Sequence, residues 1–525
     1  MRIMGAETGF WVDSIAVELE RRKKNRFVIG GGISASGRVH LGNLRSDVIV
    51  PDALRRVLEE RGYEVSTYLI AYSQDPFKAK PSQLIWFEDP EYAEKMIGVP
   101  KDYSPSPELI EKYKGRRLID IPDPLGCCNS WIHHFWKKEF EPLLERFGKN
   151  PSVILTSEFY KMEKTKEAVR KFLEKREDAR YIINRYRKRN PHPEGWIPFN
   201  PWCVKCSSIE GTTALDIDLD KWRVYYRCDR CGHEGWSPME EGKLDWRLEW
   251  STIWYVTGSD CEPYGKDHAA AGGSRESSVE LLEGVLGGRA PLGFFCEWVG
   301  KVWEGKDMGD MTSSGNILFS PAQWLEVSPP QVLRYLYIAH KHTKRFSIDL
   351  SSIYKFIDDY DRAERVFFGL EEEENDRVRL NLTRGYELSQ LEKPEKPPTQ
   401  IPYTYAALLS QVFDPEKDFE KILQQLRRSG HITGTPHDTD YIQSRLLQAR
   451  RWAEKYAPEN YRIEVLERVP PEVKTSLTPE QKNALLTLAK ELRLKDWNEK
   501  DLQNRIYELR NEFGITSQDL FAAIY

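Results

Sequence analysis

Residues 26–70 read RFVIGGGISASGRVHLGNLRSDVIVPDALRRVLEERGYEVSTYLI, and this stretch decides the fold. The apolar run at 26–29 predicts a strand, the Gly/Ser-rich segment 30–37 a turn, and the apolar spacing of 44–61 a helix. A second strand is predicted at 64–70. Strand, tight turn, helix and strand make a βαβ unit, which implies a parallel sheet with binding sites at the carboxyl ends of its strands.

The composition is typical of a multidomain globular protein. The chain has 525 residues, 16 Trp, 25 Tyr and 21 Phe, which exclude a fibrous or wholly disordered chain and leave room for roughly three or four domains. No apolar run approaches the ~20 residues of a membrane-spanning helix, and no signal peptide is visible, so we expect a cytoplasmic protein with no membrane partner. The net charge of −5 gives no global signal for nucleic acid, although a basic face on one domain would suffice.

Beyond residue 75 the alternation of strand and helix stops. Six of the eight cysteines fall before residue 245, and apolar strand candidates return near 292–299. A Pro-rich segment at 392–403, which follows the acidic run 371–374, predicts a domain boundary. The residues after it have helical periodicity, at 405–428, 439–456, 479–493 and 497–512.

Two cysteine pairs have the spacing of a zinc ribbon. Cys203 and Cys206 form the first pair, Cys228 and Cys231 form the second, and 21 residues separate the pairs. Each pair puts two thiols on one tight turn, and in an intracellular chain such pairs indicate a metal site rather than disulfides. The alternatives are four unligated buried thiols, or a site in which His233 replaces one thiol.

A second candidate metal site lies within twelve residues. Asp123, Cys127, Cys128 and His134 could fill four coordination positions. On a helix beginning near residue 129, His134 would face the cysteine loop, and His133 would point about 100° away. Adjacent cysteines are also common as packing residues, so the residues alone leave both interpretations open.

The segment 30–43, GGGISASGRVHLGN, is a candidate nucleotide site between a strand and a helix. Its small residues let the backbone approach a ligand closely, and the N–H groups at the helix start can bind phosphate. His40 and Asn43 add two polar side chains at that helix start. A Gly-rich loop is weak evidence alone, and the His-x-Gly-Asn element is the sharper signal.

Several motifs in order resemble the class I lysyl-tRNA synthetases of archaea and some bacteria. His40-Leu41-Gly42-Asn43 is similar to the His-Ile-Gly-His signature of class I aminoacyl-tRNA synthetases. The narrower resemblance runs almost end to end, through GISASGRVHLGN (32–43), DPLGCC with HHF (123–135), CGHEGW (231–236), EPYGKDHAAAG (262–272), ILFSP (317–321) and AEKYAP (453–458).

The resemblance implies an α/β fold: a Rossmann-type parallel-sheet catalytic domain with zinc-binding insertions, followed by an all-α C-terminal anticodon-binding domain. Its segments are the first half of the catalytic domain (1–75), an insertion with two zinc-binding subdomains (76–245), the second half (246–330), a helical connector (331–400) and the anticodon-binding domain (401–525). Arg445, Arg450 and Arg451 could form a basic face in the last domain. We expect that domain to be shorter than in the family, either by nature or because the sequence is a fragment.

The resemblance also implies a reaction, the ATP-dependent ligation of L-lysine to tRNA(Lys) through a lysyl-adenylate. The implied partners are tRNA, ATP and lysine, with Mg²⁺ bound to ATP and zinc at two sites, in a protein that we expect to be a monomer. The implied catalytic residues are His40, Asn43 and His268, and the implied ATP-binding residues are Ser36, Gly37, His40, Gly42, Asn43, Met311, Ser313 and Ser314. The implied amino-acid-binding residues are Gly32, Ser34, Asp75, Trp254 and His268, and the implied metal ligands are Asp123, Cys127, Cys128, His134, Cys203, Cys206, Cys228 and Cys231.

The sequence departs from the family in three respects. In the second class I signature, Lys-Met-Ser-Lys-Ser, Asp310 stands at the first lysine and the second lysine is missing; Lys301 and Lys306 could substitute. The family has an acidic stretch after the second strand, of which this chain keeps only Asp75, and Val256 stands where the family has a histidine. Both of the latter changes fall in the amino-acid pocket, so lysine specificity is the weakest implication.

These departures leave two alternatives open. One is a diverged class I synthetase paralogue that activates another amino acid or uses another acceptor. The other is a non-catalytic RNA-binding paralogue, against which the retention of His40, Asn43 and His268 argues.

Overall fold

The computed structural model describes residues 9–35, 37, 39–80, 83–84, 94, 105–123, 126–148, 151–313, 317–433, 436, 438–464, 468–495 and 497–524. The chain divides into two compact units, Met1–Pro398 with Lys455–Ala457, and Thr399–Glu454 with Pro458–Tyr525. The division falls inside the Pro-rich segment 392–403.

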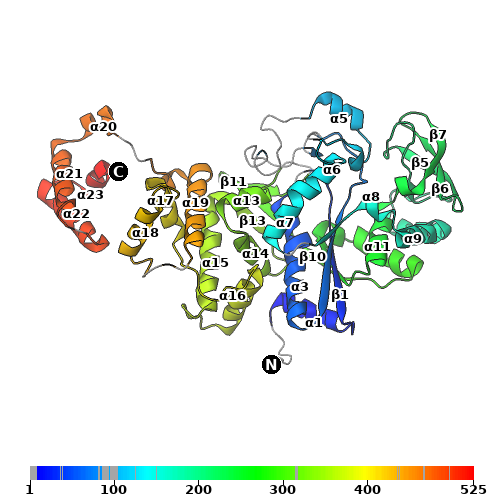
Figure 1. Ribbon diagram of the computed structural model, residues 1–525, viewed down its shortest axis with the longest axis horizontal. Coiled ribbons are helices and arrows are strands. Elements are labelled where there is room, and N and C mark those ends of the chain that lie inside the picture. The colour runs from blue at the N-terminus through cyan, green and yellow to red at the C-terminus, as the bar shows by residue number, and fades with distance from the viewer. Residues whose placement is uncertain are drawn as a thin grey trace. The chain divides into compact units, whose positions relative to one another are not determined.

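The first unit is built on a five-stranded parallel sheet of order β10-β9-β1-β2-β3 (Figure 1). Its strands are β1 (Arg26–Ile33), β2 (Glu64–Ala71), β3 (Ser152–Leu155), β9 (Cys261–Gly265) and β10 (Leu292–Cys296). The chain order reverses between β1 and β9, which is where doubly wound sheets bind ligands. The predicted α/β fold with a parallel sheet is confirmed.

Strand β3 lies inside the segment 76–245 that was predicted as an insertion. It pairs in parallel with β2, with Tyr68 opposite Ser152. The segment is therefore interrupted by a strand of the central sheet, and four residues are too short a run to show this in the sequence.

Strand β1 extends four residues beyond its predicted end, through glycines that were expected to form a turn. A Cβ atom at Gly30 would lie 2.2 Å from the hydroxyl of Tyr68, and one at Gly32 would lie 2.8 Å from the hydroxyl of Tyr72. The glycines therefore make room for two tyrosines of the neighbouring strand.

The helix after this strand begins three residues earlier than predicted and widens in its middle. It consists of α2 (Leu41–Leu44), a π-helical segment at Arg45–Ile49 and α3 (Val50–Glu60). Pro51 lies in the first turn of α3 and has no N–H to donate to the preceding turn. A π-helical segment also precedes Pro142, at Phe135–Phe140. Such segments are frequent at functional sites.

The remaining elements of the first unit cover the sheet and extend it. Its other helices are α1 (Trp11–Glu20), α5 (Pro107–Tyr113), α6 (Trp131–His134), α7 (Glu141–Phe147), α8 (Thr156–Phe159), α9 (Glu163–Glu174), α10 (Arg176–Tyr186), α11 (Trp246–Thr257), α12 (Ser274–Leu281), α13 (Pro321–Val327), α14 (Pro330–Ile338), α15 (Ile353–Phe367) and α16 (Asp376–Ser389). Its smaller sheets contain β4 (Phe199–Asn200) with β8 (Lys243–Leu244), β5 (Thr212–Asp218) with β6 (Arg223–Cys228) and β7 (Glu234–Pro238), and β11 (Val299–Trp303) with β12 (Lys306–Asp310) and β13 (Phe346–Asp349).

In its described residues the second unit is helical. Its helices are α17 (Tyr403–Val412), α18 (Phe419–Arg428), α19 (Thr439–Lys455), α20 (Pro471–Ser476), α21 (Pro479–Leu492), α22 (Glu499–Phe513) and α23 (Ser517–Ile524). Arg445, Arg450 and Arg451 were expected to form a basic face on α19, and this prediction is wrong for Arg445, which is buried. Its guanidinium lies over the ring of Tyr403 and donates to the hydroxyl of Tyr441.

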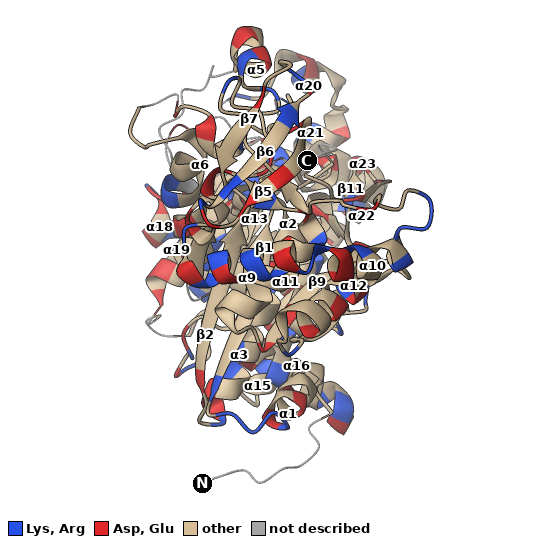
Figure 2. Ribbon diagram, turned by 90° about the vertical axis from the view of Figure 1, so that its right-hand side faces the viewer, with Lys and Arg blue, Asp and Glu red and all other residues tan. Residues whose placement is uncertain are grey.

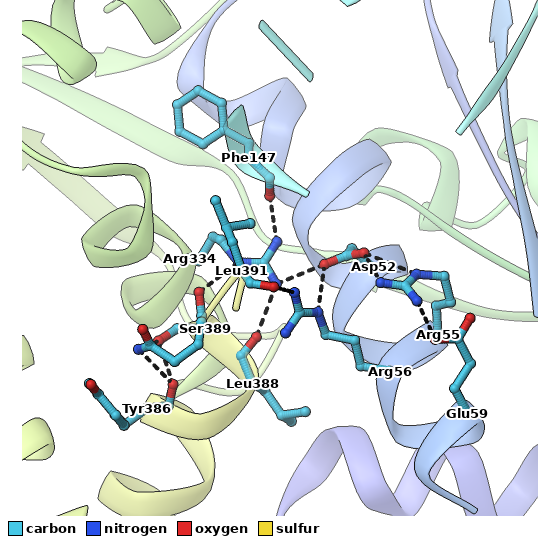
Figure 3. Close-up of polar contacts among 11 residues, drawn as sticks. Asp52, Arg55, Arg56, Glu59, Phe147, Arg334, Tyr386, Leu388, Ser389 and Leu391 are labelled. Atoms are coloured by element: carbon cyan, nitrogen blue, oxygen red, sulfur yellow. Dashed lines mark hydrogen bonds and ion pairs between the residues drawn. The ribbon is translucent and has the colours of Figure 1, made fainter. Parts of the chain in front are cut away.

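A buried ion network ties α3 to three other helices (Figure 3). Asp52 accepts from Arg334 at 2.8 Å and from Arg55 at 2.7 Å. Arg334 is fully buried and also donates to the carbonyls of Phe147, Leu388 and Ser389, at the ends of α7 and α16. Burial alone would raise the pKa of Asp52, but the charges of Arg334, Arg55 and Arg56 lower it to about 2.

Replacing Arg334 by methionine should cost about 3–5 kcal/mol of the first unit's unfolding free energy, because it leaves a buried carboxylate short of a cation. Urea unfolding followed by tryptophan fluorescence measures the change. Arg365→Met is the matched control, because Arg365 pairs with Glu371 at the surface, where loss of a pair costs under ~1 kcal/mol. Equal losses in the two variants would contradict this assignment.

Candidate functional site

The main pocket of the first unit has a volume of 820 Å³ and lies at the carboxyl ends of the parallel strands. Gly32 lines it from β1 and Ser34 from just after that strand, Gly265 from β9 and Cys296 from β10. It therefore sits at the point where the strand order reverses, as expected for this kind of sheet. Its size suits a nucleotide and a small substrate together.

The His-x-Gly-Asn element forms one wall of the pocket. Asn43 Oδ1 accepts from the backbone N–H of His40 at 3.0 Å, and this bond fixes the start of the helix. The His40 imidazole is buried against Gly42, where a Cβ would come within 2.9 Å of the ring. Its Nδ1 has no hydrogen-bond partner among the described residues. Burial lowers the pKa of His40 to about 4, so the ring is neutral at pH 7.

A buried carboxylate, Glu262, forms part of the pocket lining. It accepts from the Tyr68 hydroxyl at 3.0 Å and from the indole N–H groups of Trp250 and Trp254 at 2.7 and 2.8 Å. All three donors are neutral, and burial raises the pKa of Glu262. A cation in the pocket would find this carboxylate already oriented.

Trp254 was predicted to line the amino-acid site, and the structure places it behind Glu262. Its indole is buried, and the tryptophans that line the pocket are Trp246, Trp250 and Trp298. The predicted residue therefore orients the carboxylate through its N–H.

Asp75 lines the pocket as predicted, but an internal cation already occupies its carboxylate. Lys243 Nζ lies 2.5 Å from Asp75 Oδ1 and 2.8 Å from Glu249 Oε2. Burial would lower the pKa of Lys243, but the two carboxylates raise it, so the ammonium stays charged. Asp75 is thus less available to a cationic substrate than Glu262.

His268 lies at the pocket edge, in the loop 266–273. Its Nδ1 is 2.6 Å from the Ser274 hydroxyl, and its ring lies near Trp246 and Trp250. Burial lowers its pKa, and the charge of Asp267 opposes this shift. A neutral imidazole can accept or donate one proton here.

Asp47 is a pocket residue that the sequence reasoning missed. It lies in the π-helical segment, and its carboxylate accepts from the Gly32 N–H at 3.2 Å and from the Ser46 hydroxyl at 2.8 Å. Burial raises its pKa to about 7, hydrogen bonds from Ser46 and Gly32 oppose this, and the charges of Glu262 and Asp267 add to it. A polar residue one turn after the helix start at His40 to Asn43 could have pointed to it.

The signature segment closes another side of the pocket. Asp310, Met311 and Thr312 line it, and Gly37 packs so closely on the Ser313 backbone that a Cβ would come within 2.1 Å of its carbonyl oxygen. Ser36 and Ser314, two of the predicted ATP-binding residues, lie outside the described residues.

The carboxylate of Asp310 is paired. Arg345, which precedes β13, donates from Nε to Asp310 Oδ1 at 2.9 Å. Lys301 Nζ donates to the Leu318 carbonyl at 2.7 Å and lies over the Phe319 ring. Lys306 is exposed at the start of β12, four residues before Asp310, or about 13 Å along the strand. Arg345 is therefore the cation next to the position where the family has lysine.

The four ribbon cysteines converge as predicted. The Sγ atoms of Cys203 and Cys231 are 3.7 Å apart, as are those of Cys206 and Cys228, beside the antiparallel sheet β5-β6-β7. His233 is not part of the cluster, since its ring packs against Tyr226. Four thiols at this separation fit a tetrahedral metal.

The second predicted cluster also comes together. His134 Nδ1 lies 3.1 Å from Cys127 Sγ and 3.4 Å from Asp123 Oδ1, and Cys128 Sγ lies 3.3 Å from Cys127 Sγ. His133 points elsewhere and contacts the Ser130 hydroxyl. The donor set of two thiols, one imidazole and one carboxylate suits zinc.

The parallel sheet with a pocket at its strand reversal defines an α/β protein of the nucleotide-binding type. The family model described as tRNA synthetases class I (K) matches residues 9–392. A lysine–tRNA ligase of Aeropyrum pernix is 38% identical over 505 residues, covering 95% of this chain and 88% of the relative. That of Pyrococcus horikoshii is 33% identical over 528 residues, covering 98% and 93%. The chain belongs to the class I (K) family of tRNA synthetases, which confirms the resemblance seen in its sequence.

Solved structures of other aminoacyl-tRNA synthetases are more distant from this chain. A glutamate–tRNA ligase from Elizabethkingia meningosepticum is 10% identical, with a TM-score of 0.35 over 94% of this chain and 91% of that chain. The arginyl-tRNA synthetase of Thermus thermophilus is 12% identical, with a TM-score of 0.30 over 97% and 86%. Within the described residues, no helix is both long and apolar enough to cross a bilayer.

The raised pKa of Asp47 predicts a pH-dependent cost in stability. Its proton is retained to about pH 7 in the folded state but is lost near pH 4 in the unfolded chain, so this group's stabilising contribution declines between pH 4 and 7. The unfolding free energy of Asp47→Asn, relative to that of wild type, should therefore rise by about 2–3 kcal/mol from pH 5 to pH 8. Urea unfolding at both pH values measures this, with the exposed Asp220→Asn as control. A variant that tracks wild type at both values would refute the shift.

Proposed function

We propose that this protein ligates L-lysine to tRNA(Lys) with ATP, through a lysyl-adenylate. The lysine carboxylate attacks the α-phosphorus of ATP and pyrophosphate leaves; the terminal ribose hydroxyl of tRNA then takes the lysyl group and AMP leaves. The observation that carries the choice of lysine is Glu262, a buried pocket carboxylate held by three neutral donors. The charge of Arg275 also acts on Glu262, but among the described residues no cation lies within ion-pair distance of this carboxylate, and Lys243 pairs with Asp75 and Glu249. An ε-ammonium beside Glu262 would supply that direct ion pair and favour its charged form.

His40 and Asn43 would stabilise the phosphates at the start of α2. His40 offers a neutral N–H from a buried ring, and a ligand charge nearby would raise its pKa. Mg²⁺ would accompany ATP and neutralise phosphate charge, and the pocket carboxylates of Asp267 and Glu297 are oxygen ligands of the kind that it takes. His268 would lie beside the acceptor hydroxyl or the amino acid, with its orientation set by Ser274.

Amino-acid activation tests the function directly. In pyrophosphate exchange and tRNA charging with each of the twenty amino acids, with and without tRNA, lysine alone should give signal. His40→Ala should reduce that signal about 100-fold, as expected for loss of one transition-state donor. Signal with another amino acid would favour the diverged paralogue. Silence in folded protein would favour the non-catalytic RNA-binding alternative.

We propose further that the two clusters hold zinc. The ribbon site would have four thiolates from Cys203, Cys206, Cys228 and Cys231, and the second would have Asp123, Cys127, Cys128 and His134. Closed sites of this kind stabilise a fold and carry out no chemistry.

Metal analysis of the purified protein should give two zinc ions per chain. Cys206→Ser and Cys128→Ser should each remove one, because each breaks a separate cluster. Cys261→Ser should keep both, since Cys261 is buried in β9 away from either cluster. One ion in the wild-type protein would reject the second site.

Arg345 would take the place of the missing signature lysine at the ATP phosphates. Its guanidinium is held by Asp310 and lies near Ser347 and Gly300, at the edge of the strands whose ends line the pocket. Asp310 thus positions a cation instead of repelling the triphosphate with an unpaired charge.

Arg345→Gln should lower kcat/KM for ATP about 10- to 100-fold in pyrophosphate exchange, and Asp310→Lys added to it should recover activity, because a lysine then stands at the family position. Lys306→Gln is the control and should change little. Unchanged kinetics in Arg345→Gln would show that groups other than Arg345 bind the ATP phosphates.

A further inference from the structure

A basic turn follows α10 in the first unit. Arg187, Lys188 and Arg189 are consecutive, and the last two are exposed. Arg185, one turn earlier, pairs with Glu280 of α12. In the described part of the chain, no carboxylate lies within ion-pair distance of Arg187, Lys188 or Arg189, so this turn presents three uncompensated positive charges.

Hydrogen bonds hold the turn in one conformation. Asn184 Nδ2 donates to the His192 carbonyl at 2.9 Å, and the His192 N–H donates back to Asn184 Oδ1 at 2.8 Å. Arg187 Nε donates to the Asn190 carbonyl at 3.0 Å. Because the backbone is already ordered, a ligand that binds these charges has less entropy to remove.

The turn lies against the loop that carries His268. Arg185 to Asn190 and the loop residues Ala271 and Gly272 line one open groove of 660 Å³. A Cβ at Gly272 would lie 3.8 Å from the Tyr186 carbonyl oxygen. Figure 2 shows the basic stretch as blue ribbon beyond α10, on the same side of the first unit as α11 and α12. The loop 266–273 therefore lines both this groove, through Ala271 and Gly272, and the main pocket, through Asp267 and His268.

The loop itself is braced from the pocket side. Arg247 donates to the carbonyls of Gly272 and Gly273 at 3.2 Å and to the Ser277 hydroxyl at 2.5 Å. A ligand lying along the groove would thus meet a fixed edge that leads toward His268.

A partner for this groove must carry closely spaced negative charge and must send one end into the pocket. A single-stranded nucleic-acid end has both properties, with one phosphate per nucleotide and a terminal ribose to react. We infer that Arg187, Lys188 and Arg189 bind the sugar–phosphate backbone beside the 3′ end of tRNA and guide its terminal ribose to the pocket. This inference rests on the proposed function, and it assigns the acceptor end to a surface that the family resemblance did not specify.

The test uses the full-length protein and two RNAs, tRNA(Lys) and a minihelix that contains only the acceptor stem with its single-stranded 3′ end. Arg187→Gln/Lys188→Gln/Arg189→Gln removes the three charges, and Lys188→Gln/Arg189→Gln keeps the Arg187 bond to Asn190. The matched control is Arg21→Gln/Lys23→Gln/Arg26→Gln, which removes three charges at the start of β1, the end of the strand opposite to the pocket.

The triple variant should raise KM for tRNA at least tenfold and leave kcat at saturating tRNA unchanged. Its minihelix affinity should lose about two to three units of slope against the logarithm of salt concentration, as expected for three phosphate contacts. The double variant should show about two thirds of the change in log KM and about two thirds of the change in salt slope. The control triple variant should match wild type in both measurements.

Wild-type kinetics and salt slope in the two groove variants would overturn the inference, as would equal losses in the control triple. If the wild-type protein charges no tRNA with lysine, the proposed function fails, and minihelix binding still decides whether the groove binds RNA.

Discussion

The pocket depends on one steric constraint, the absence of a side chain at Gly30. Tyr68 of β2 lies where a Cβ of that residue would stand, reaches across β1 and donates to Glu262 of β9. Three adjacent strands are thereby joined at the point where the sheet reverses its order. Trp250 and Trp254 complete the shell around the carboxylate from α11. Any larger residue at position 30 would displace the tyrosine and leave this buried acid with one donor fewer, at a cost typical of an unsatisfied polar group.

Three of the carboxylates that line the pocket, Asp75, Glu297 and Asp310, are each paired with a cation of this chain. Lys243 neutralises Asp75, Lys266 pairs with Glu297, and Arg345 pairs with Asp310. The departures from the family motifs are therefore accompanied by local compensation. Asp75, which remains from the acidic stretch, is paired with Lys243, and the place of the missing lysine has a cation beside it in Arg345, the residue before β13. Such compensation agrees better with a working site than with an abandoned one.

The segment 76–245, between the two halves of the sheet, is part of the first unit and supplies elements of its fold. It supplies β3, both cysteine clusters and the helix that leads to the basic turn. The network around Asp52 and Arg334 fixes α3 to the helices that follow the second half of the sheet. This network thus holds the helix that continues from α2, and Arg247 holds the end of the loop 266–273. Fixed walls of this kind position two bound substrates for reaction.

The sequence by itself determined the features that depend on local spacing. The βαβ unit, the two cysteine clusters and the helical C-terminal region follow from periodicity and from ligands on short turns, and the structure brings these residues together as expected. Only the tertiary structure decided which acid faces the pocket, because Tyr68 and Glu262 are 194 residues apart and Lys243 lies 168 residues from Asp75. The same reason hid the partner of Asp310, because Arg345 lies 35 residues away, whereas β3 was missed because it is only four residues long. Burial and pairing across such separations are set by packing, and no local pattern encodes them.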